Sequence, residues 1–198
     1  MCADKKNGKM IVIVAPSGSG KSTLIKMMKA DFPSLNESIS FTTRAPREGE
    51  KNGVHYHFIA AAQFEKMIAD GEFLEWAKVH NNYYGTSKTF VEKQLADGKD
   101  ILFDIDVQGA DAVKKIFKEK AQIIFISPPS IEELEKRLLH RGTDSREVIN
   151  VRLKNAEKEM LKKNDYDFCV VNDALDTAYA KLKSVVLKIF GGTTCSNA

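Results

Sequence analysis

A loop of small residues, Ala15-Pro16-Ser17-Gly18-Ser19-Gly20-Lys21-Ser22-Thr23, separates a short apolar run from an amphipathic segment. The apolar run, residues 10–14, predicts a buried strand, and residues 24–29 predict the opening of a helix. Strand, loop and helix in this order cradle phosphate, because the loop amides and the positive end of the helix dipole face one anion. Lys21 adds a point charge, and the Ser22 hydroxyl is placed to bind Mg²⁺ beside the phosphates. The segment therefore predicts a nucleoside triphosphate site.

One position departs from the strict pattern of such loops, G-x-x-x-x-G-K-[ST], because Ala15 stands where the pattern has its first glycine. The alternative interpretation is an ordinary turn before a helix, with a solvated lysine. The strand before the loop and the helix after it are the context that a phosphate loop needs, so they favour the phosphate site.

Composition indicates one compact domain. The chain has 198 residues, of which 43% are hydrophobic, and a formal net charge of +3, too small to predict general nucleic-acid binding. No apolar run approaches the length of about 18 residues that a membrane span needs, and the first residues lack the apolar core of a signal peptide. Cys2, Cys169 and Cys195 lack metal-ligand spacing and fit a reducing compartment. We therefore expect a cytoplasmic protein without a membrane or nucleic-acid partner.

Alternating apolar runs and helical patterns predict an α/β fold with a parallel sheet flanked by helices. The predicted core elements are helices over about 88–96, 109–117 and 174–190 and strands over 100–106, 121–127 and 168–172. Ligands of such sheets gather at the carboxyl ends of the strands. Asp104 and Asp106 end the first of these strands and are expected at that edge.

Two segments depart from the core pattern. Residues 35–84 predict short antiparallel strands and one helix, which indicates a small inserted subdomain where an acceptor can bind. Within it, residues 38–43 alternate like an exposed strand, and Trp76 is expected to pack in the core and aim Glu75. Residues 131–162 predict a pair of charged helices.

The polar loop of the inserted segment carries Arg44 and Arg47 on either side of a proline, with Tyr56 and Tyr84 further along the chain. Two guanidinium groups and two phenolic hydroxyls are phosphate ligands. Paired loop arginines are usually only solvated, so this set alone is weak evidence. Beside a phosphate loop it gains meaning, because a kinase needs a second anion site for its acceptor.

These segments, taken in order from about residue 10 to 190, resemble the successive motifs of the guanylate kinase family. The matching segments are the loop 15–23, Thr42-Thr43-Arg44-Ala45-Pro46-Arg47-x-x-Glu50-x-x-Gly53-x-x-Tyr56, Glu75-Trp76, Tyr83-Tyr84-Gly85-Thr86, Asp104-Ile105-Asp106-x-Gln108-Gly109, Pro128-Pro129-Ser130, Arg137-Leu138-x-x-Arg141-Gly142-Thr143 and Val171-Asn172-Asp173. The resemblance implies Mg²⁺-dependent transfer of the γ-phosphoryl group of ATP to GMP, and to dGMP as well. Thr86 stands where some members have serine, and it keeps the hydroxyl.

The resemblance also implies a role for each matching residue. Guanine would be read by Ser40, Glu75, Thr86 and Asp106, and the GMP phosphate would be held by Arg44, Arg47, Tyr56 and Tyr84, with Glu50 orienting the arginines and Asp104 beside them. ATP would be bound by Ser17, Gly18, Ser19, Gly20, Lys21, Ser22, Thr23, Arg137, Arg141 and Asn172, the last at the adenine. Ser22 and Asp104 would hold Mg²⁺, and the catalytic groups would be Lys21, Arg44, Arg137, Arg141 and Arg152.

The same resemblance implies a three-part arrangement within one domain covering residues 1–198. A three-layer core would comprise about 9–36, 88–130 and 163–190, the GMP-binding insert about 37–87, and a helical lid about 131–162. We expect a monomer, with a dimer as the alternative.

The base-reading residues agree with the chemistry of guanine. Guanine offers two adjacent N–H donors and one carbonyl acceptor, so carboxylates such as Glu75 and Asp106 can accept while Ser40 or Thr86 donates. Adenine presents the opposite pattern, which would leave a buried carboxylate facing an acceptor. A polar site of this type can reject the wrong base by on the order of 10⁴.

Two other functions stay open from the sequence alone. Guanylate-kinase-like domains also serve as protein-interaction modules that have lost catalysis, usually with a degraded phosphate loop. This chain keeps Gly18, Gly20, Lys21 and Ser22, which disfavours that reading. A kinase for another nucleoside monophosphate is disfavoured by the base-reading set.

Overall fold

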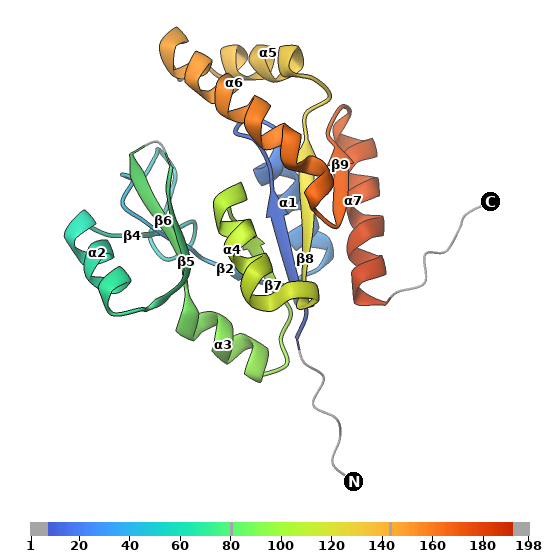
Figure 1. The fold of residues 1–198 in the computed structure, drawn as a ribbon. Helices are drawn as coiled ribbons and strands as arrows, with labels where there is room; N and C mark the ends of the chain where they lie inside the picture. Colours follow the sequence, from blue (N-terminus) through green and yellow to red (C-terminus); the bar gives the residue numbers. More distant parts are fainter. Residues whose placement is uncertain (1–7, 80, 143, 192–198) are drawn as a thin grey trace. The chain divides into compact units, whose positions relative to one another are not determined.

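The computed structural model describes residues 8–79, 81–142 and 144–191 (Figure 1). Within this part of the chain the residues group into two compact units. Unit 1 comprises the described residues of Met1–Val12 and Ser34–Ala121, and unit 2 those of Ile13–Pro33 and Gln122–Ala198. The predicted loose ends, 1–8 and 191–198, fall almost entirely outside the described residues.

The predicted parallel sheet is present, in the strand order β2-β7-β1-β8-β9. Its strands are β1 (Met10–Val14), β2 (Asn36–Ser38), β7 (Ile101–Asp104), β8 (Ala121–Ser127) and β9 (Phe168–Val171). Parallel pairing joins β2 to β7 in unit 1 and β8 to β9 in unit 2. All five residues of β1 are buried, as expected for a strand covered on both faces.

Unit 1 also contains a smaller sheet, in the order β4-β3-β6-β5. Its strands are β3 (Phe41–Thr42), β4 (His57–Phe58), β5 (Phe73–Val79) and β6 (Asn82–Ser87). The helices of unit 1 are α2 (Ala61–Ala69), α3 (Lys88–Ala96), α4 (Val107–Phe117) and the short η1 (Lys118–Lys120). Phe64 of α2 is fully buried and stacks on Phe73 and Tyr83, at 4.3 and 5.2 Å between ring centroids. This aromatic cluster anchors α2 on the sheet.

Unit 2 contains α1 (Lys21–Asp31), α5 (Ile131–Arg141), α6 (Arg146–Leu161), η2 (Lys162–Asp165) and α7 (Leu175–Phe190). Leu134 and Leu138 of α5 form a buried cluster with Ile149 and Ala156 of α6, which joins the two charged helices. Tyr179 of α7 donates a hydrogen bond to the Met27 carbonyl of α1 at 3.1 Å. Among the described residues, no helix combines the length and apolar character that crossing a membrane requires.

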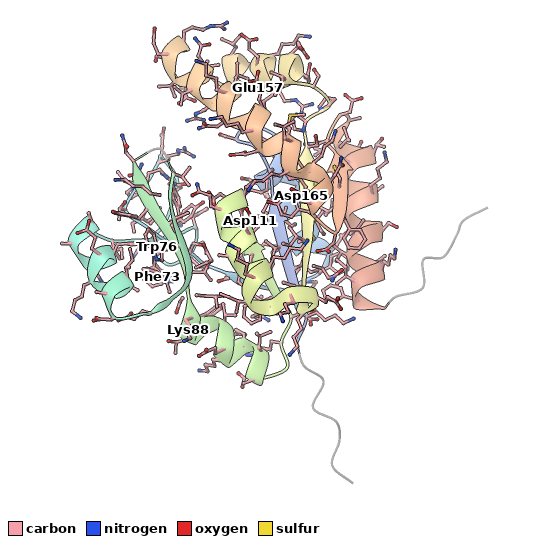
Figure 2. The ribbon with its side chains drawn as sticks, in the orientation of Figure 1. Phe73, Trp76, Lys88, Asp111, Glu157 and Asp165 are labelled. Atoms are coloured by element: carbon pink, nitrogen blue, oxygen red, sulfur yellow. The ribbon has the colours of Figure 1, made fainter. Side chains whose placement is uncertain are left out.

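Three sequence expectations about the inserted segment were wrong. Residues 38–43 do not form one strand, because β2 pairs with β7 of the parallel sheet and β3 pairs with β4 and β6 of the smaller sheet. The β4 strand, moreover, runs parallel to β3 rather than antiparallel. Trp76, labelled in Figure 2, is 47% exposed rather than in the core. Alternation along β5 places it on the face opposite buried Glu75.

Candidate functional site

The loop between β1 and α1 has the backbone that the sequence predicts for a phosphate cradle. Gly18 and Gly20 have φ of 94° and 86°, a region that residues with side chains rarely adopt. Helix α1 begins at Lys21 with Gly20 as its N-cap, and it has neither a capping side chain nor an acidic residue in its first turn. The first amide groups of α1 are therefore not capped by an internal anion, and they suit a phosphate ligand.

Ala15, the departure from the strict loop pattern, is compatible with this geometry. Among the described residues other than glycine, only Asn81 and Lys118 have positive φ. Position 15 therefore does not require the conformational freedom of glycine. Its alanine side chain is 9% exposed and packs with the core.

Asn172, predicted at the adenine, is bound to the phosphate loop itself. Its Nδ2 donates to the Ser19 carbonyl at 2.7 Å, and a Cβ on Gly20 would lie only 2.3 Å from the same nitrogen. Arg137 donates to the backbone carbonyls of Asn172 and Asp173, at 2.9 and 3.3 Å. Asn172 therefore fixes the loop that follows β1, and Arg137 fixes the backbone that carries Asn172.

Helices α5 and α6 also contact this loop. Arg152 of α6 donates to the Ser17 hydroxyl at 3.3 Å and pairs with Asp144 at 2.9 Å. A Cβ on Gly18 would lie 2.9 Å from Cδ2 of Leu138, so the glycine permits α5 to pack closely against the loop. Unit 2 thus brings Arg137 and Arg152 together with the phosphate loop.

The remaining predicted ATP ligands lie at the start of α1. Lys21 is half-buried, whereas Ser22 and Thr23 are exposed in the first turn. The hydroxyl groups therefore stay accessible to a ligand beside the helix N-terminus. The side chain of Arg141, the third predicted lid arginine, lies outside the described residues.

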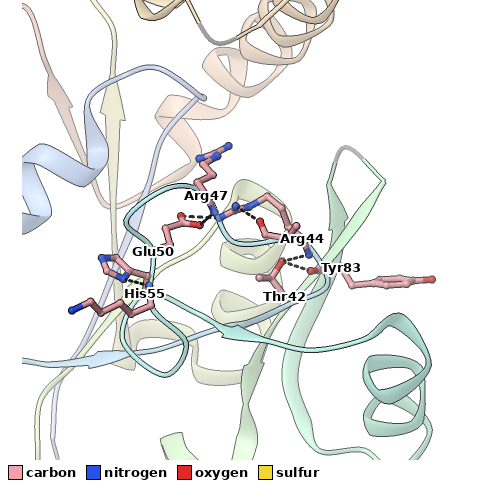
Figure 3. Close-up of polar contacts among 8 residues, drawn as sticks. Thr42, Arg44, Arg47, Glu50, His55 and Tyr83 are labelled. Carbon is pink, nitrogen blue, oxygen red and sulfur yellow. Dashed lines mark hydrogen bonds and ion pairs between the residues drawn. The ribbon is translucent and has the colours of Figure 1, made fainter.

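In unit 1, Glu50 organises both arginines of the predicted acceptor loop (Figure 3). Its Oε1 accepts from Nη2 of Arg44 at 2.9 Å, and its Oε2 accepts from the backbone N–H of Arg47 at 2.7 Å. Burial raises the pKa of Glu50, but the bonds from Arg44 and Arg47 outweigh burial and hold that pKa below its ordinary value. Glu50 therefore favours its ionised form, in which it orients the Arg44 guanidinium and fixes the backbone at Arg47.

The start of the same loop is fixed by Thr42, whose hydroxyl donates to the Tyr83 carbonyl at 2.9 Å and accepts from the backbone N–H of Arg44 at 3.2 Å (Figure 3). His55 accepts from the backbone N–H of Lys51 at 3.0 Å. These bonds hold the loop at both ends. The Arg47 side chain extends from it into solvent.

Tyr56 and Tyr84 lie beside Arg44. The Arg44 guanidinium lies 5.5 Å from the centre of the Tyr56 ring, and the Tyr56 and Tyr84 rings meet edge to face at 6.0 Å. Burial, and then the negative charge of Asp104, raises the pKa of Tyr56 well above its ordinary value. The Tyr56 hydroxyl therefore stays protonated and can donate to an anion.

The predicted guanine-reading residues of β5, β6 and α4 also come together in unit 1. The Thr86 hydroxyl donates to Oε1 of Glu75 at 2.5 Å, and Asp106, the N-cap of α4, accepts from the backbone N–H of Gly109 at 2.9 Å. Burial, with a contribution from the nearby Asp106 charge, raises the pKa of Glu75 to about 7. A carboxylate this poorly solvated gains most from a ligand that donates hydrogen bonds to it.

Ser40, the fourth predicted base-reading residue, is 6% exposed and lies between β2 and β3. Its hydroxyl can donate one hydrogen bond, whereas the Thr86 hydroxyl already donates to Glu75.

Two residues that sequence reasoning gave no role are placed at these sites. Gly109 lies against Glu75 and Asp106, and Asp144 pairs with Arg152. A glycine inside a helix is unfavourable relative to alanine, so its presence in α4 was a usable signal of close packing. The Asp144–Arg152 pair had no comparable signal, because charged residues on helices are usually solvated.

The raised pKa of Glu75 predicts a pH-dependent cost to folding. Between the ordinary value of 4.5 and about 7, the folded protein binds this proton and the unfolded chain does not, so stability falls as pH rises through that window. We expect Glu75→Gln to remove the cost, so that the variant gains up to roughly 3 kcal/mol relative to wild type between pH 4.5 and pH 8. Urea unfolding at several pH values measures this difference.

The matched control is Glu92→Gln, which changes an exposed carboxylate on α3. Its free energy of unfolding should follow that of wild type at every pH. If the free energy of unfolding of Glu75→Gln differs from that of wild type by the same amount from pH 4.5 to pH 8, the assigned cost of burying Glu75 is wrong.

Known proteins resemble this chain over nearly its whole length. The family model described as guanylate kinase matches residues 7–189. The guanylate kinase of Dechloromonas aromatica is 50% identical over 179 residues, 90% of this chain and 88% of that protein. That of Idiomarina loihiensis is 48% identical over 189 residues, 94% of this chain and 90% of that protein.

Solved structures agree with the sequence comparisons. The crystal structure of guanylate kinase from Anaplasma phagocytophilum matches this fold with a TM-score of 0.75 at 31% identity, covering 96% of this chain and 89% of that one. The expected α/β fold, with a parallel sheet flanked by helices, is thereby confirmed. With both sequence and fold matched, the chain belongs to the guanylate kinase family.

Proposed function

We propose that this protein transfers the γ-phosphoryl group of ATP to GMP, and to dGMP, giving ADP and GDP or dGDP. The relatives named guanylate kinase support the activity, and the loop around Glu50 supports the acceptor assignment. That observation carries the proposal, because Glu50 bonds to the Arg44 side chain and to the Arg47 backbone within a unit that also contains the proposed base-reading carboxylates. A monophosphate whose base donates hydrogen bonds fits both features.

In the acceptor site, Arg44 and Arg47 would bind the GMP phosphate, with the Tyr56 and Tyr84 hydroxyls as further donors. Glu50 would keep Arg44 aimed while leaving other guanidinium N–H groups for the phosphate, because a guanidinium has five donors. The acceptor oxygen is already ionised, so the reaction needs no strong general base. Catalysis then consists mainly of positioning and charge stabilisation.

In the base site, Glu75 and Asp106 would accept hydrogen bonds from N1 and the 2-amino group of guanine. Because the Thr86 hydroxyl donates to Glu75, the donor to the guanine carbonyl would be Ser40. Thr86 would then act by orienting Glu75. On this proposal the two hydroxyls, which the sequence left as alternatives, have different roles.

In the donor site, the amides of residues 17–23 and the Lys21 ammonium would hold the ATP phosphates, with Asn172 near the adenine. Arg137, Arg141 and Arg152 would approach the transferring phosphoryl group as parts of a helical lid over about 131–162. An arginine that stabilises this transition state can supply about 10³-fold or more in rate. Exclusion of water would protect ATP from hydrolysis.

Mg²⁺ fits the donor atoms that these residues present. Ser22 and Asp104 offer hard oxygen ligands, and no cluster of three or more His, Cys, Asp or Glu side chains able to hold a metal occurs in the described parts of the chain. Mg²⁺ usually keeps several waters and binds one or two protein oxygens together with substrate phosphates. When bound, it would neutralise charge on the β- and γ-phosphates.

A coupled assay of ADP release with a panel of nucleoside monophosphates tests the activity. We expect turnover with GMP and dGMP, loss of turnover when Mg²⁺ is removed with EDTA, and a preference over AMP on the order of 10⁴. Turnover with AMP but not GMP would refute the assignment of the base site. Failure with every acceptor would favour the interaction-module alternative.

Two substitutions separate the donor and acceptor sites. Lys21→Ala should abolish turnover, because the ammonium stabilises charge on the transferring phosphates. Arg44→Ala should raise KM for GMP by about 100-fold, with KM for ATP nearly unchanged, because a charge-assisted bond is worth about 1.5–3 kcal/mol. Steady-state kinetics with each substrate varied in turn measures both effects. Near-normal turnover of the Lys21→Ala variant would remove the loop from the mechanism.

We also propose that the protein works as a monomer in the cytoplasm. Each predicted ligand set comes from this one chain, so no partner needs to complete a site, and ATP and GMP are cytoplasmic metabolites. Light scattering after size exclusion should give the mass of one chain, unchanged over a tenfold concentration range. A stable dimer mass would overturn the proposal of a monomer. Recovery of the protein in the membrane fraction of cells would overturn the proposed location.

A further inference from the structure

Gly109 lies in contact with both carboxylates of the proposed base site. It occupies the first turn of α4, and its backbone N–H donates to Oδ1 of Asp106 at 2.9 Å. On its other side, a Cβ would lie 2.6 Å from Oε2 and 3.1 Å from Cδ of Glu75. The same Cβ would lie 3.3 Å from Oδ1 of Asp106. A methyl group at this position would therefore press on both acids.

Glu75 has little freedom to move away from such a methyl group. Its side chain is 6% exposed, and its Oε1 accepts the Thr86 hydroxyl at 2.5 Å. Cβ contacts below 3.0 Å essentially do not occur, so the Glu75 carboxylate would have to shift by several tenths of an ångström. That shift would strain the Thr86 bond or turn the carboxylate relative to Asp106.

Helix propensity does not explain this glycine. Alanine is the more favourable residue inside a helix, and the neighbouring position of α4 is occupied by Ala110, which is fully buried. The φ of Gly109 is not positive either, so backbone conformation does not require glycine. What remains is the space that the missing side chain leaves for Glu75.

We propose that Gly109 is a specificity-positioning residue, whose missing side chain and backbone N–H together set how the Glu75 and Asp106 carboxylates lie for guanine. This inference rests on the proposed function, because it assigns both acids to the base. Gly109 itself touches no reacting atom. It acts through the two acids, so its substitution should change recognition of the base more than the rate of phosphoryl transfer.

Gly109→Ala in the full chain tests the proposal. We expect KM for GMP to rise about tenfold or more, because displacements below 1 Å at a positioned group have effects of this size. The kcat at saturating GMP and KM for ATP should change less than about threefold, since the phosphate ligands are not displaced. The melting temperature should fall only slightly, because the higher helix propensity of alanine offsets part of the strain from the displaced Glu75.

A second measurement reports the carboxylates directly. Inosine monophosphate is GMP without the 2-amino group, so the ratio of kcat/KM for GMP to that for inosine monophosphate measures the hydrogen bonds to that group. In the Gly109→Ala variant this ratio should fall at least about fivefold. An unchanged ratio and an unchanged KM for GMP would overturn the proposal.

Shortening Glu75 provides a test by rescue. Glu75→Asp withdraws the carboxylate from Gly109 by one methylene, so it should impair GMP use in the wild-type chain but much less in the Gly109→Ala background. Strictly additive effects on kcat/KM would mean that the two residues act independently, and would contradict the inference. The control is Gln108→Ala, a change to an exposed residue in the same turn, which should leave all these constants unchanged.

Kinetics of wild type, Glu75→Gln and Gly109→Ala together distinguish a failure of this inference from a failure of the proposed function. If wild type does not use GMP, or if Glu75→Gln leaves KM for GMP unchanged, the assignment of the base site is wrong. If Glu75→Gln raises KM for GMP but Gly109→Ala does not, the base site stands and only the role of Gly109 is wrong. A collapse of melting temperature in Gly109→Ala, with GMP and ATP affected equally, would show a purely structural residue.

Discussion

Both candidate binding regions depend on the close approach of a polar side chain to a backbone that carries no Cβ. In unit 2 the Asn172 amide occupies the space that a side chain on Gly20 would take, and in unit 1 the Glu75 carboxylate does the same at Gly109. Interiors packed to native density do not absorb even a methyl group without a shift. Each glycine therefore fixes a polar group against the backbone to within tenths of an ångström. Hydrogen bonds to a nucleotide need that precision, because their strength falls steeply with distance and angle.

Arg44, Arg137 and Arg152, near the two candidate sites, are also held in place before a ligand binds. Each bonds to an acid or a carbonyl and still has N–H donors left. Arg44 bonds to Glu50 and Arg152 to Asp144, each at 2.9 Å and each less than one fifth exposed. Such pairs contribute little stability by themselves, since desolvation offsets much of the attraction between the charges. Their effect is to restrict the rotamers of a long side chain before any ligand binds, which lowers the entropy that binding must overcome.

Much of the fold follows from local sequence patterns. The buried run of β1 and the apolar spacing of α2 and α5 are signals within single elements. Ser130 and Ser145 cap α5 and α6 with their hydroxyl groups, as serine commonly does before a helix. The run 38–43 was misjudged because its alternation is compatible with one strand or with two strands in different sheets. Only pairing with β7 and β6, far along the chain, decides between them.

The candidate site likewise has features that local sequence predicts and contacts between residues far apart in the chain that it does not. The family resemblance pointed to the residues, and the conformations of Gly18 and Gly20 follow from local backbone preference. The contacts that define their roles join residues far apart in sequence, such as Asn172 to Ser19 and Glu75 to Gly109. Composition and periodicity do not encode which distant residues meet. The prediction that Trp76 is buried was wrong for a simpler reason. Its size suggested burial, but the alternation of β5 places it on the exposed face.

The donor count of Arg137 limits how this residue can serve a nucleotide. Its Nε bonds to Glu133, and its two terminal nitrogens bond to the carbonyls of Asn172 and Asp173. These three bonds leave one N–H on each terminal nitrogen, since a guanidinium has five donors. Arg137 therefore keeps two N–H groups that can donate to a phosphate oxygen while its bonds to the two carbonyls persist. On the proposed assignment, Arg137 would orient the backbone that carries Asn172 and bind the donor at the same time. Arg152 bonds to the Ser17 hydroxyl of the loop at 3.3 Å and to Asp144 at 2.9 Å, and the bond to the neutral hydroxyl is the weaker one to give up when the side chain turns to a ligand.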